Sequence, residues 1–246
     1  MGGAMIVLPI FLQMTLEYNA MQAGLSLAPL SLSMFAVAVL AGRRSGKHRA
    51  SSIVRMGFAL TTAGMVLLIP LVPRADFGWL LIGPLLLAGS GLGLLVSQLN
   101  NYTLAPIEEE RVSEAAGVNS AAGSFGLSFG LAVAGGLMLA ALSLSFTRMT
   151  ESSTVIPSDQ QQRISQSLEH DAQVMSNTQL DASLVGATEA VRVEILSINT
   201  HARDLSLQVA LLVPVIAGLL GLFNSFRMMR LPEIAPSSST EGTVLG

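Results

Sequence analysis

The residue types that most often carry catalysis or bind metals are few and scattered in this sequence. The chain has no cysteine, which excludes a thiolate nucleophile, a disulfide and a cysteine-ligated metal site. His48, His170 and His201 are its three histidines, and they show no metal-ligand spacing such as HExxH. No serine, histidine and carboxylate pattern of a hydrolase stands out. We therefore predict that the chain is not an enzyme and that it holds no metal and no cofactor.

One glycine-rich segment, GSGLG at residues 89–93, superficially resembles a nucleotide-binding loop. It lacks the GxGxxG spacing, follows no predicted strand and lies in a charge-free apolar stretch. Small residues in such a stretch are typical of helices that pack closely in a membrane, so we interpret the segment as a packing surface. The net charge of −3 likewise gives no indication of a nucleic-acid partner.

Uncharged polar side chains within the apolar stretches are better candidates for a binding site. An amide or hydroxyl that faces lipid lacks a hydrogen-bond partner, so such groups are expected to face protein or a water-filled cavity. The candidates for a substrate cavity are Gln13, Gln98, Asn100, Asn119, Ser124 and Ser128. Contact with another helix is the alternative for each of them. No ionisable residue lies inside an apolar stretch, and Glu17, at the edge of the first one, is the nearest proton-carrying candidate.

The distribution of charge identifies the elements that must position these side chains. Of the 246 residues, 51% are hydrophobic and only 12% are charged, and the charges avoid several long stretches. The stretches without Asp, Glu, Lys or Arg are 1–16, 18–42, 56–73, 77–107, 115–147 and 205–226. A soluble globular protein needs charge over its whole surface, and a disordered chain has low hydrophobicity. The pattern therefore predicts an all-α polytopic membrane protein.

Six transmembrane helices are predicted, within one bundle that covers residues 1–230. The predicted spans are 1–16, 22–42, 53–73, 77–99, 117–142 and 205–226. The first is shorter than the roughly 20 residues that cross a bilayer, so we expect the chain to begin inside a longer helix. Pro9 and Pro84 fall at similar depths in the first and fourth spans, which favours two inverted repeats of three helices.

The orientation follows from the basic residues of the short connections. The loop between the second and third spans carries Arg43, Arg44, Lys47 and Arg49, and we predict that it is cytoplasmic. Alternation then places the segment 143–204 outside, where we expect one or two amphipathic helices, and the C-terminus in the cytoplasm. Residues 231–246 are predicted to form a disordered cytoplasmic tail.

The fifth span carries a regular small face. Gly126, Gly130 and Ala134 recur every four residues, a spacing that lets another helix approach closely. We predict that this face packs against a neighbouring helix. Such packing suits the sliding helices of a transporter and suits a static role equally well.

Four motifs together resemble a known family. They are LPIFLQ at 8–13, QAGLSLAP at 22–29, GSGLG at 89–93 and AAGVN at 115–119. In this order and spacing, the chain resembles the C-terminal half of a major facilitator superfamily exporter. The nearest match is the fourteen-helix drug:proton antiporter subfamily, the EmrB/QacA-like proteins. The basic loop departs from the family pattern, because Gly46 stands where the family has Asp and Lys47 where it has Arg.

The resemblance implies half of a secondary-active exporter that works by alternating access in the bacterial plasma (inner) membrane. Its partners would be the lipid bilayer, a small hydrophobic or cationic substrate, protons, and a missing N-terminal half of the transporter. Two alternatives stay open at this point. One is a non-transporting membrane scaffold or truncated remnant, and the other is a transporter for a dedicated small solute.

Overall fold

The computed structural model describes residues 2–43, 49–75, 77–104, 106–171 and 175–228. These residues form helices and short connections, and no strand occurs among them. The α-helices are α1 (Gly2–Ile10), α2 (Ala20–Arg43), α3 (Ala50–Leu71), α4 (Ile82–Leu104), α5 (Val112–Ser152), α6 (Ser158–Asp171), α7 (Asn177–Ser183) and α8 (Glu189–Met228). A π-helical segment, η1 (Phe11–Thr15), continues α1, and η2 (Val72–Arg74), η3 (Gly78–Leu81) and η4 (Glu109–Arg111) are 3-10 turns. The predicted all-α fold is confirmed.

Within the described chain, five helices are long and apolar enough to cross a membrane, and they contain the last five predicted spans. They are Ala20–Arg43, Ala50–Arg74, Gly78–Leu104, Glu109–Ser152 and Glu189–Arg227. The first predicted span is helical over Gly2–Thr15. At 1.5 Å per residue this helix is about 20 Å long, less than the roughly 30 Å of hydrocarbon. The protein is therefore a polytopic membrane protein.

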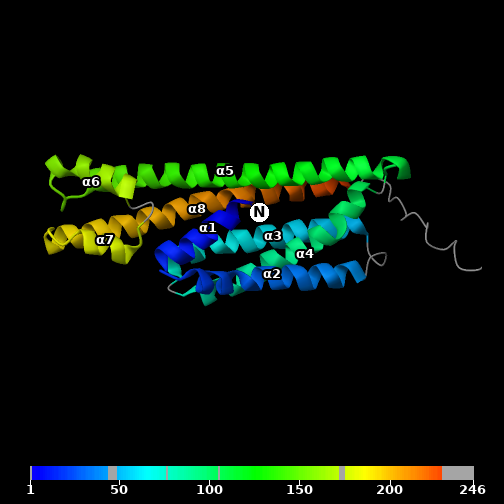
Figure 1. The fold of residues 1–246 in the computed structure, drawn as a ribbon, viewed down its shortest axis with the longest axis horizontal. Helices are drawn as coiled ribbons and strands as arrows, with labels where there is room; N and C mark the ends of the chain where they lie inside the picture. Colours follow the sequence, from blue (N-terminus) through cyan, green and yellow to red (C-terminus); the bar gives the residue numbers. More distant parts are fainter. Residues whose placement is uncertain (1, 44–48, 76, 105, 172–174, 229–246) are drawn as a thin grey trace, which may run out of the picture.

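The helices form an elongated bundle in which α5 and α8 run side by side along nearly the whole length (Figure 1). α4 packs between α2 and α3, α3 packs on α8, and α1 contacts both α5 and α8. The largest buried cluster joins these helices through side chains such as Phe11, Met65, Leu85 and Leu211. In a membrane such side chains stabilise the bundle through close van der Waals packing. Removal from water contributes little there, because lipid is as apolar as the core itself.

Small residues allow α4 to approach both of its neighbours. A Cβ on Gly91 would lie 2.5 Å from the backbone nitrogen of Thr61 on α3, and a Cβ on Gly89 would lie 2.2 Å from the backbone oxygen of Leu30 on α2. Real Cβ atoms are not found this close to backbone atoms, so only glycine fits at these two positions. The interpretation of the GSGLG segment as a helix-packing surface is confirmed.

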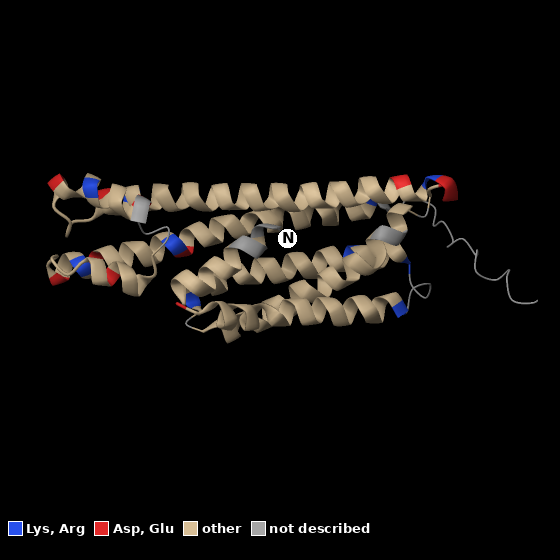
Figure 2. Ribbon diagram, in the orientation of Figure 1, with Lys and Arg blue, Asp and Glu red and all other residues tan. Residues whose placement is uncertain are grey.

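Figure 2 shows that Lys, Arg, Asp and Glu gather toward the two ends of the molecule, while long parts of α2, α4 and α5 carry none. One end holds α6 and α7 and is called the cap end. The other, the far end, holds Arg43 at the end of α2 and the turn that leads into α5. A band without charge between two charged ends is what a lipid bilayer requires of a spanning protein.

The predicted outer segment 143–204 is an ordered helical cap. α5 has 41 residues and α8 has 40, so each is about 60 Å long, twice the hydrocarbon thickness. α5 thus continues ten residues past the predicted end of its span, and α8 begins well before 205. α6 packs on α5 and α7 on α8, as the predicted amphipathic helices. The cap has its own buried cluster, formed by Leu142, Phe146, Ile156, Leu168, Leu180, Ile195, Ile198 and Ala202.

Candidate functional site

The far half of α5, residues 117–130, gathers three of the predicted cavity residues on one helix. Ser124 and Ser128 are exposed and Asn119 is half-buried. On the same segment, the rings of Phe125 and Phe129 stack with centroids 5.9 Å apart, and these side chains are 70% and 59% exposed. Two hydroxyls and a stacked aromatic pair therefore lie exposed on a helix that is apolar enough to cross a membrane.

The exposure of this segment follows from the position of the neighbouring helices. Ala134, Met138 and Leu142 are buried, so α5 is covered from about residue 134 toward the cap. Gly130 is half-buried, Gly126 is exposed, and no atom lies within 4 Å of a Cβ built on Gly126. Of the three predicted packing residues, the described chain therefore buries Ala134 alone. Close packing at Gly126 needs a surface that the described chain does not supply, and it stays a prediction about a partner.

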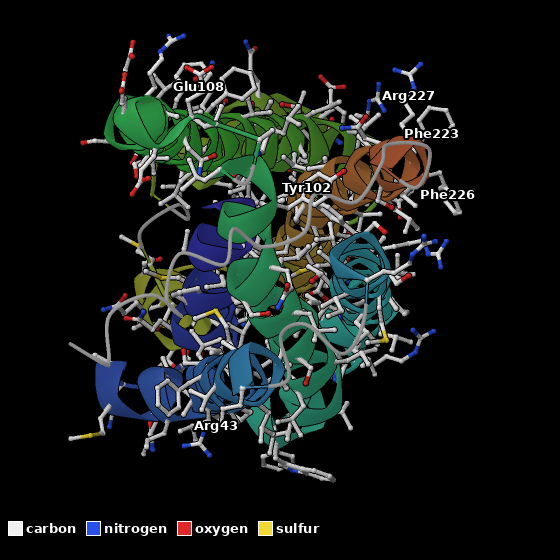
Figure 3. All side chains as sticks on the ribbon, turned by 90° about the vertical axis from the view of Figure 1, so that its right-hand side faces the viewer. Arg43, Tyr102, Glu108, Phe223, Phe226 and Arg227 are labelled. Carbon is white, nitrogen blue, oxygen red and sulfur yellow. The ribbon has the colours of Figure 1, made fainter. Side chains whose placement is uncertain are left out.

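Figure 3 looks at the far end of the bundle. The labelled residues Arg43, Glu108 and Arg227 come from α2, from the turn before α5 and from α8, and they lie around the periphery. Tyr102, near the end of α4, lies nearer the middle. Arg55 also belongs to this end and places its guanidinium 5.6 Å from the ring centroid of Phe226 on α8. Such a cation–π contact lets a basic side chain remain at the membrane edge.

The remaining cavity candidates are not part of the α5 segment. Gln98 on α4 is 3% exposed, and its Nε2 is buried without a hydrogen-bond partner. Gln13 lies in η1, where it is exposed and donates to the carbonyl of Pro9 at 3.4 Å. The side chain of Asn100 lies outside the described part of the structure. The structure thus places Asn119, Ser124 and Ser128 on one helix, with Asn119 on a different face of α5 from the two serines, and it keeps the Gln98 side chain of α4 in the interior.

The predicted basic loop is described only at its two ends. Arg43 is the last residue of α2, where a cation interacts favourably with the carbonyl groups that end a helix. Arg49 immediately precedes α3, and its carbonyl accepts from the backbone nitrogen of Ser52 at 3.0 Å. Arg44 and Lys47 lie outside the described residues. The two described arginines are therefore together at the far end, as the predicted loop requires.

Sequence reasoning missed a buried arginine that joins the cap to the bundle. Arg203 on α8 is 5% exposed, and its Nη1 donates to the carbonyl of Met14 in η1 at 2.9 Å. Its Nη2 donates to the carbonyl of Met175, just before α7. The three residues are far apart in sequence, so spacing did not reveal the contact. The sequence did offer one indication of this contact, because Arg203 lies only two residues before the charge-free stretch 205–226.

Glu17 forms a second tie between the bundle and the cap. Its two carboxylate oxygens accept from the backbone nitrogen of Thr178 at 2.7 Å and from the Thr178 hydroxyl at 2.6 Å. These hydrogen bonds, the hydroxyl contact above all, hold the pKa of Glu17 below its usual value. Glu17 also has a φ of 55°, a left-handed backbone that a non-glycine residue adopts only when its surroundings hold it there. A carboxylate kept charged in this way suits a structural tie better than a proton carrier.

The geometry is that of a membrane bundle with a partly uncovered polar helix, and comparison with known proteins identifies the family. A family model of the Major Facilitator Superfamily matches residues 1–131. The chain belongs to the major facilitator superfamily. No group of three or more His, Asp or Glu that could hold a metal ion occurs in the part of the chain that the structure describes. The chain is therefore related to membrane transporters.

Individual relatives match similar portions of the chain. It is 32% identical over 130 residues to the uncharacterized transporter YebQ of Escherichia coli, which covers 53% of this chain and 28% of that protein. It is 25% identical over 149 residues to a probable actinorhodin transporter of Streptomyces coelicolor, and this match covers 59% of this chain and 26% of that protein. It is 29% identical over 141 residues to the multidrug resistance protein Stp of Mycobacterium tuberculosis, and this match covers 57% of this chain and 26% of that protein. The matched part spans about a quarter of these relatives, and no solved structure matches the chain.

Proposed function

We propose that this superfamily member supplies the C-terminal half of a proton-driven exporter for small hydrophobic or cationic compounds. The names of its relatives support export, because they include the multidrug resistance protein Stp and a multidrug resistance protein B homolog, both of Mycobacterium tuberculosis. The order of the sequence motifs supports the C-terminal half and the fourteen-helix subfamily. The match to only about a quarter of each relative supports a function shared with a second bundle.

The uncovered far half of α5 is the observation that carries this proposal. Ser124 and Ser128 offer hydroxyls, Asn119 offers an amide, and the Phe125–Phe129 pair offers two aromatic faces. Aromatic faces attract cations and apolar rings, and a few polar groups fix orientation, which is the usual composition of a site for small organic molecules. Lipid offers no hydrogen-bond partner to the exposed hydroxyls of Ser124 and Ser128. A second bundle facing α5 would complete a cavity and supply such partners.

The basic residues at the far end support a cytoplasmic location for that end, and the proposal then has the cap outside and the C-terminus inside. The α5 segment 117–130 then lines the cytoplasmic half of the cavity. Rocking of the two bundles closes this half and opens the other toward the cap, as alternating access requires.

Proton coupling is assigned to the second bundle. The charge-free stretches 115–147 and 205–226 carry no carboxylate and no histidine, and these are the groups that carry protons across membranes. Glu17 is engaged by Thr178 outside these stretches. This half therefore contributes a cavity wall and a hinge surface, and its partner contributes the proton-binding group.

A transporter for one dedicated solute is the second candidate function. Two relatives carry names that specify a single compound or class, the probable actinorhodin transporter and the tetracycline resistance determinant of Streptomyces rimosus, to which the chain is 28% identical over 141 residues. The stacked phenylalanines suit an apolar ring of one dedicated solute as well as they suit a cation. Competition between chemically unrelated compounds separates the two candidates.

The absence of cysteine from the sequence permits a labelling test of the cavity wall. We expect a water-soluble maleimide to label Ser124→Cys and Ser128→Cys in membranes that also hold the N-terminal bundle of a full-length relative. Tetraphenylphosphonium, a hydrophobic cation, is expected to slow this labelling. Leu32→Cys on α2, 66% exposed in the chain and assigned to lipid, is the matched control and is expected to remain unlabelled.

Co-purification of the two bundles shows in the same membranes that the pair has formed. If Ser128→Cys is then as unreactive as Leu32→Cys, the α5 segment faces lipid or another helix, and the proposed cavity wall is refuted.

A further inference from the structure

The cap contains a cavity of about 490 Å³ that lies between α6 and α7, above α8. We call it the cap groove. It is at the opposite end of the molecule from the α5 segment 117–130 (Figure 1), so it is separate from the proposed transport cavity. Its volume falls within the range of about 300–1,000 Å³ that is usual for small-molecule sites.

The floor of the cap groove is apolar and built from three helices. Leu168 of α6, Leu180 of α7 and Ile195 of α8 line it, and each is 5% exposed or less. They belong to the buried cluster of the cap, which fixes their positions. Ile164, Met175 and Leu184 also line the groove and are half-buried, so a ligand's apolar body that covers them removes further apolar surface from water.

The rim of the cap groove has one charged side chain, Arg163 on α6. Gln160, Ser167 and Ser183 add uncharged hydrogen-bonding groups, and none of the described residues that line the groove is acidic. Arg163 is exposed, and within the described residues no hydrogen bond or ion pair engages it. An unengaged guanidinium at the mouth of an apolar groove favours a ligand that carries a negative charge.

The acidic residue that follows Leu180 of the floor does not oppose this charge. Asp181 follows Leu180 on α7, but Nε and Nη2 of Arg192 donate to its two carboxylate oxygens at 2.5 and 2.7 Å. The same arginine contacts Glu189 at 3.1 Å. These contacts hold the pKa of Asp181 below its usual value, with the Arg192 hydrogen bonds as the main cause. Its charge is therefore balanced locally, and Arg163 is the one charged side chain among the described residues that line the groove.

We propose that the cap groove binds an amphiphile with one negatively charged group, whose apolar chain lies against Ile164, Met175 and Leu184 above the buried floor and whose charged group is bound by Arg163. Both a free carboxylate and an anionic phospholipid have this chemistry. The cap groove is proposed to select an anionic ligand, whereas the transport cavity is proposed to select a cationic one. The two sites lie at opposite ends of the molecule, so binding in the cap groove does not depend on whether the chain takes part in export.

Binding of 11-(dansylamino)undecanoate to the full chain in phosphatidylcholine bilayer discs tests the proposal. Its emission moves to shorter wavelength in an apolar site, and empty discs give the background from lipid. We expect saturable binding to the natural sequence, at least tenfold weaker binding to Arg163→Gln, and recovery in Arg163→Lys. Arg148→Gln is the matched control, since Arg148 is an exposed cap arginine outside the groove, and its binding is expected to be unchanged.

A dansyl probe of equal chain length with a trimethylammonium group, in place of the carboxylate, is expected not to bind saturably. Addition of phosphatidylglycerol to the discs separates the two sources: displacement of the probe identifies a bilayer lipid, and retention identifies a free amphiphile. The proposal is overturned if the natural sequence gives no binding above empty discs. It is also overturned if Arg163→Gln binds as tightly, or if the cationic probe binds equally well.

Discussion

Replacement of Gly91 by alanine is expected to destabilise the bundle, although alanine is the better helix former. The added Cβ would lie 2.5 Å from the backbone nitrogen of Thr61 and 2.6 Å from the backbone oxygen of Gly57, whereas ordinary contact begins at 3.4 Å. Both atoms belong to the backbone of α3, so no side chain can rotate away. α3 and α4 would have to separate by nearly 1 Å, and overpacking of this kind costs about 1–3 kcal/mol.

Gly83, on the same helix, is the matched control because no atom lies within 4 Å of the Cβ that alanine would add there. The intrinsic gain from glycine to alanine in a helix is about 0.5–1 kcal/mol and is common to both positions. The difference between the two variants therefore isolates the contact with α3, and we expect Gly91→Ala to be less stable than Gly83→Ala by about 1–3 kcal/mol.

The assay is denaturant unfolding of the purified chain in mixed micelles, followed by circular dichroism, with each variant compared to the natural sequence. Equal stability of Gly91→Ala and Gly83→Ala would show that α3 and α4 are not in the close contact described. That result would refute the packing of the GSGLG segment and, with it, the arrangement of the bundle.

Three further predictions concern the partner surface, the cap junction and the topology. Gly126→Leu is expected to leave the stability of the chain alone unchanged, because the site is open, and to abolish co-purification with an N-terminal bundle; retained co-purification contradicts the packing role. Glu17→Gln is expected to lower stability near neutral pH by about 1 kcal/mol or less, since the contact is exposed. Because the folded pKa of Glu17 is below its usual 4.5, its contribution is present above that pH and is lost as the pH falls through the folded pKa. Stability curves of the natural sequence and Glu17→Gln should therefore converge in acid, and parallel curves exclude the Thr178 contact. Ser45→Cys should resist an impermeant maleimide in intact cells while Gln162→Cys in the cap reacts, and the reverse pattern inverts the topology.

The membrane-spanning part of the fold was predictable from the sequence because lipid imposes a strong rule. Charge is excluded from a spanning helix, so the charge-free stretches marked the helices, and the glycines of 89–93 marked a packing surface. The cap was harder to predict. The outer parts of α5 and α8 are amphipathic, so a search for apolar stretches ended them at the membrane surface, although the helical hydrogen bonding continues into the cap.

The candidate site was predictable only in its residue types. Asn119, Ser124 and Ser128 were recognised because polar groups in an apolar helix need partners. The small face at Gly126 predicted a packing contact, but a repeat of four residues does not reveal whether the partner helix belongs to the same chain. Arg203 was missed because its acceptors, the carbonyls of Met14 and Met175, are backbone groups that carry no sequence signal.

The central claim, that this chain supplies one half of a proton-driven exporter, is tested most directly by efflux of a fluorescent cation from liposomes under an imposed proton gradient. Liposomes that hold residues 1–246 alone are expected to show no gradient-dependent efflux, because the α5 segment then faces lipid and no carboxylate lies in the charge-free stretches. Liposomes that also hold the N-terminal bundle of a full-length relative are expected to export the cation until the gradient is collapsed. Gradient-dependent efflux by the chain alone would contradict the account.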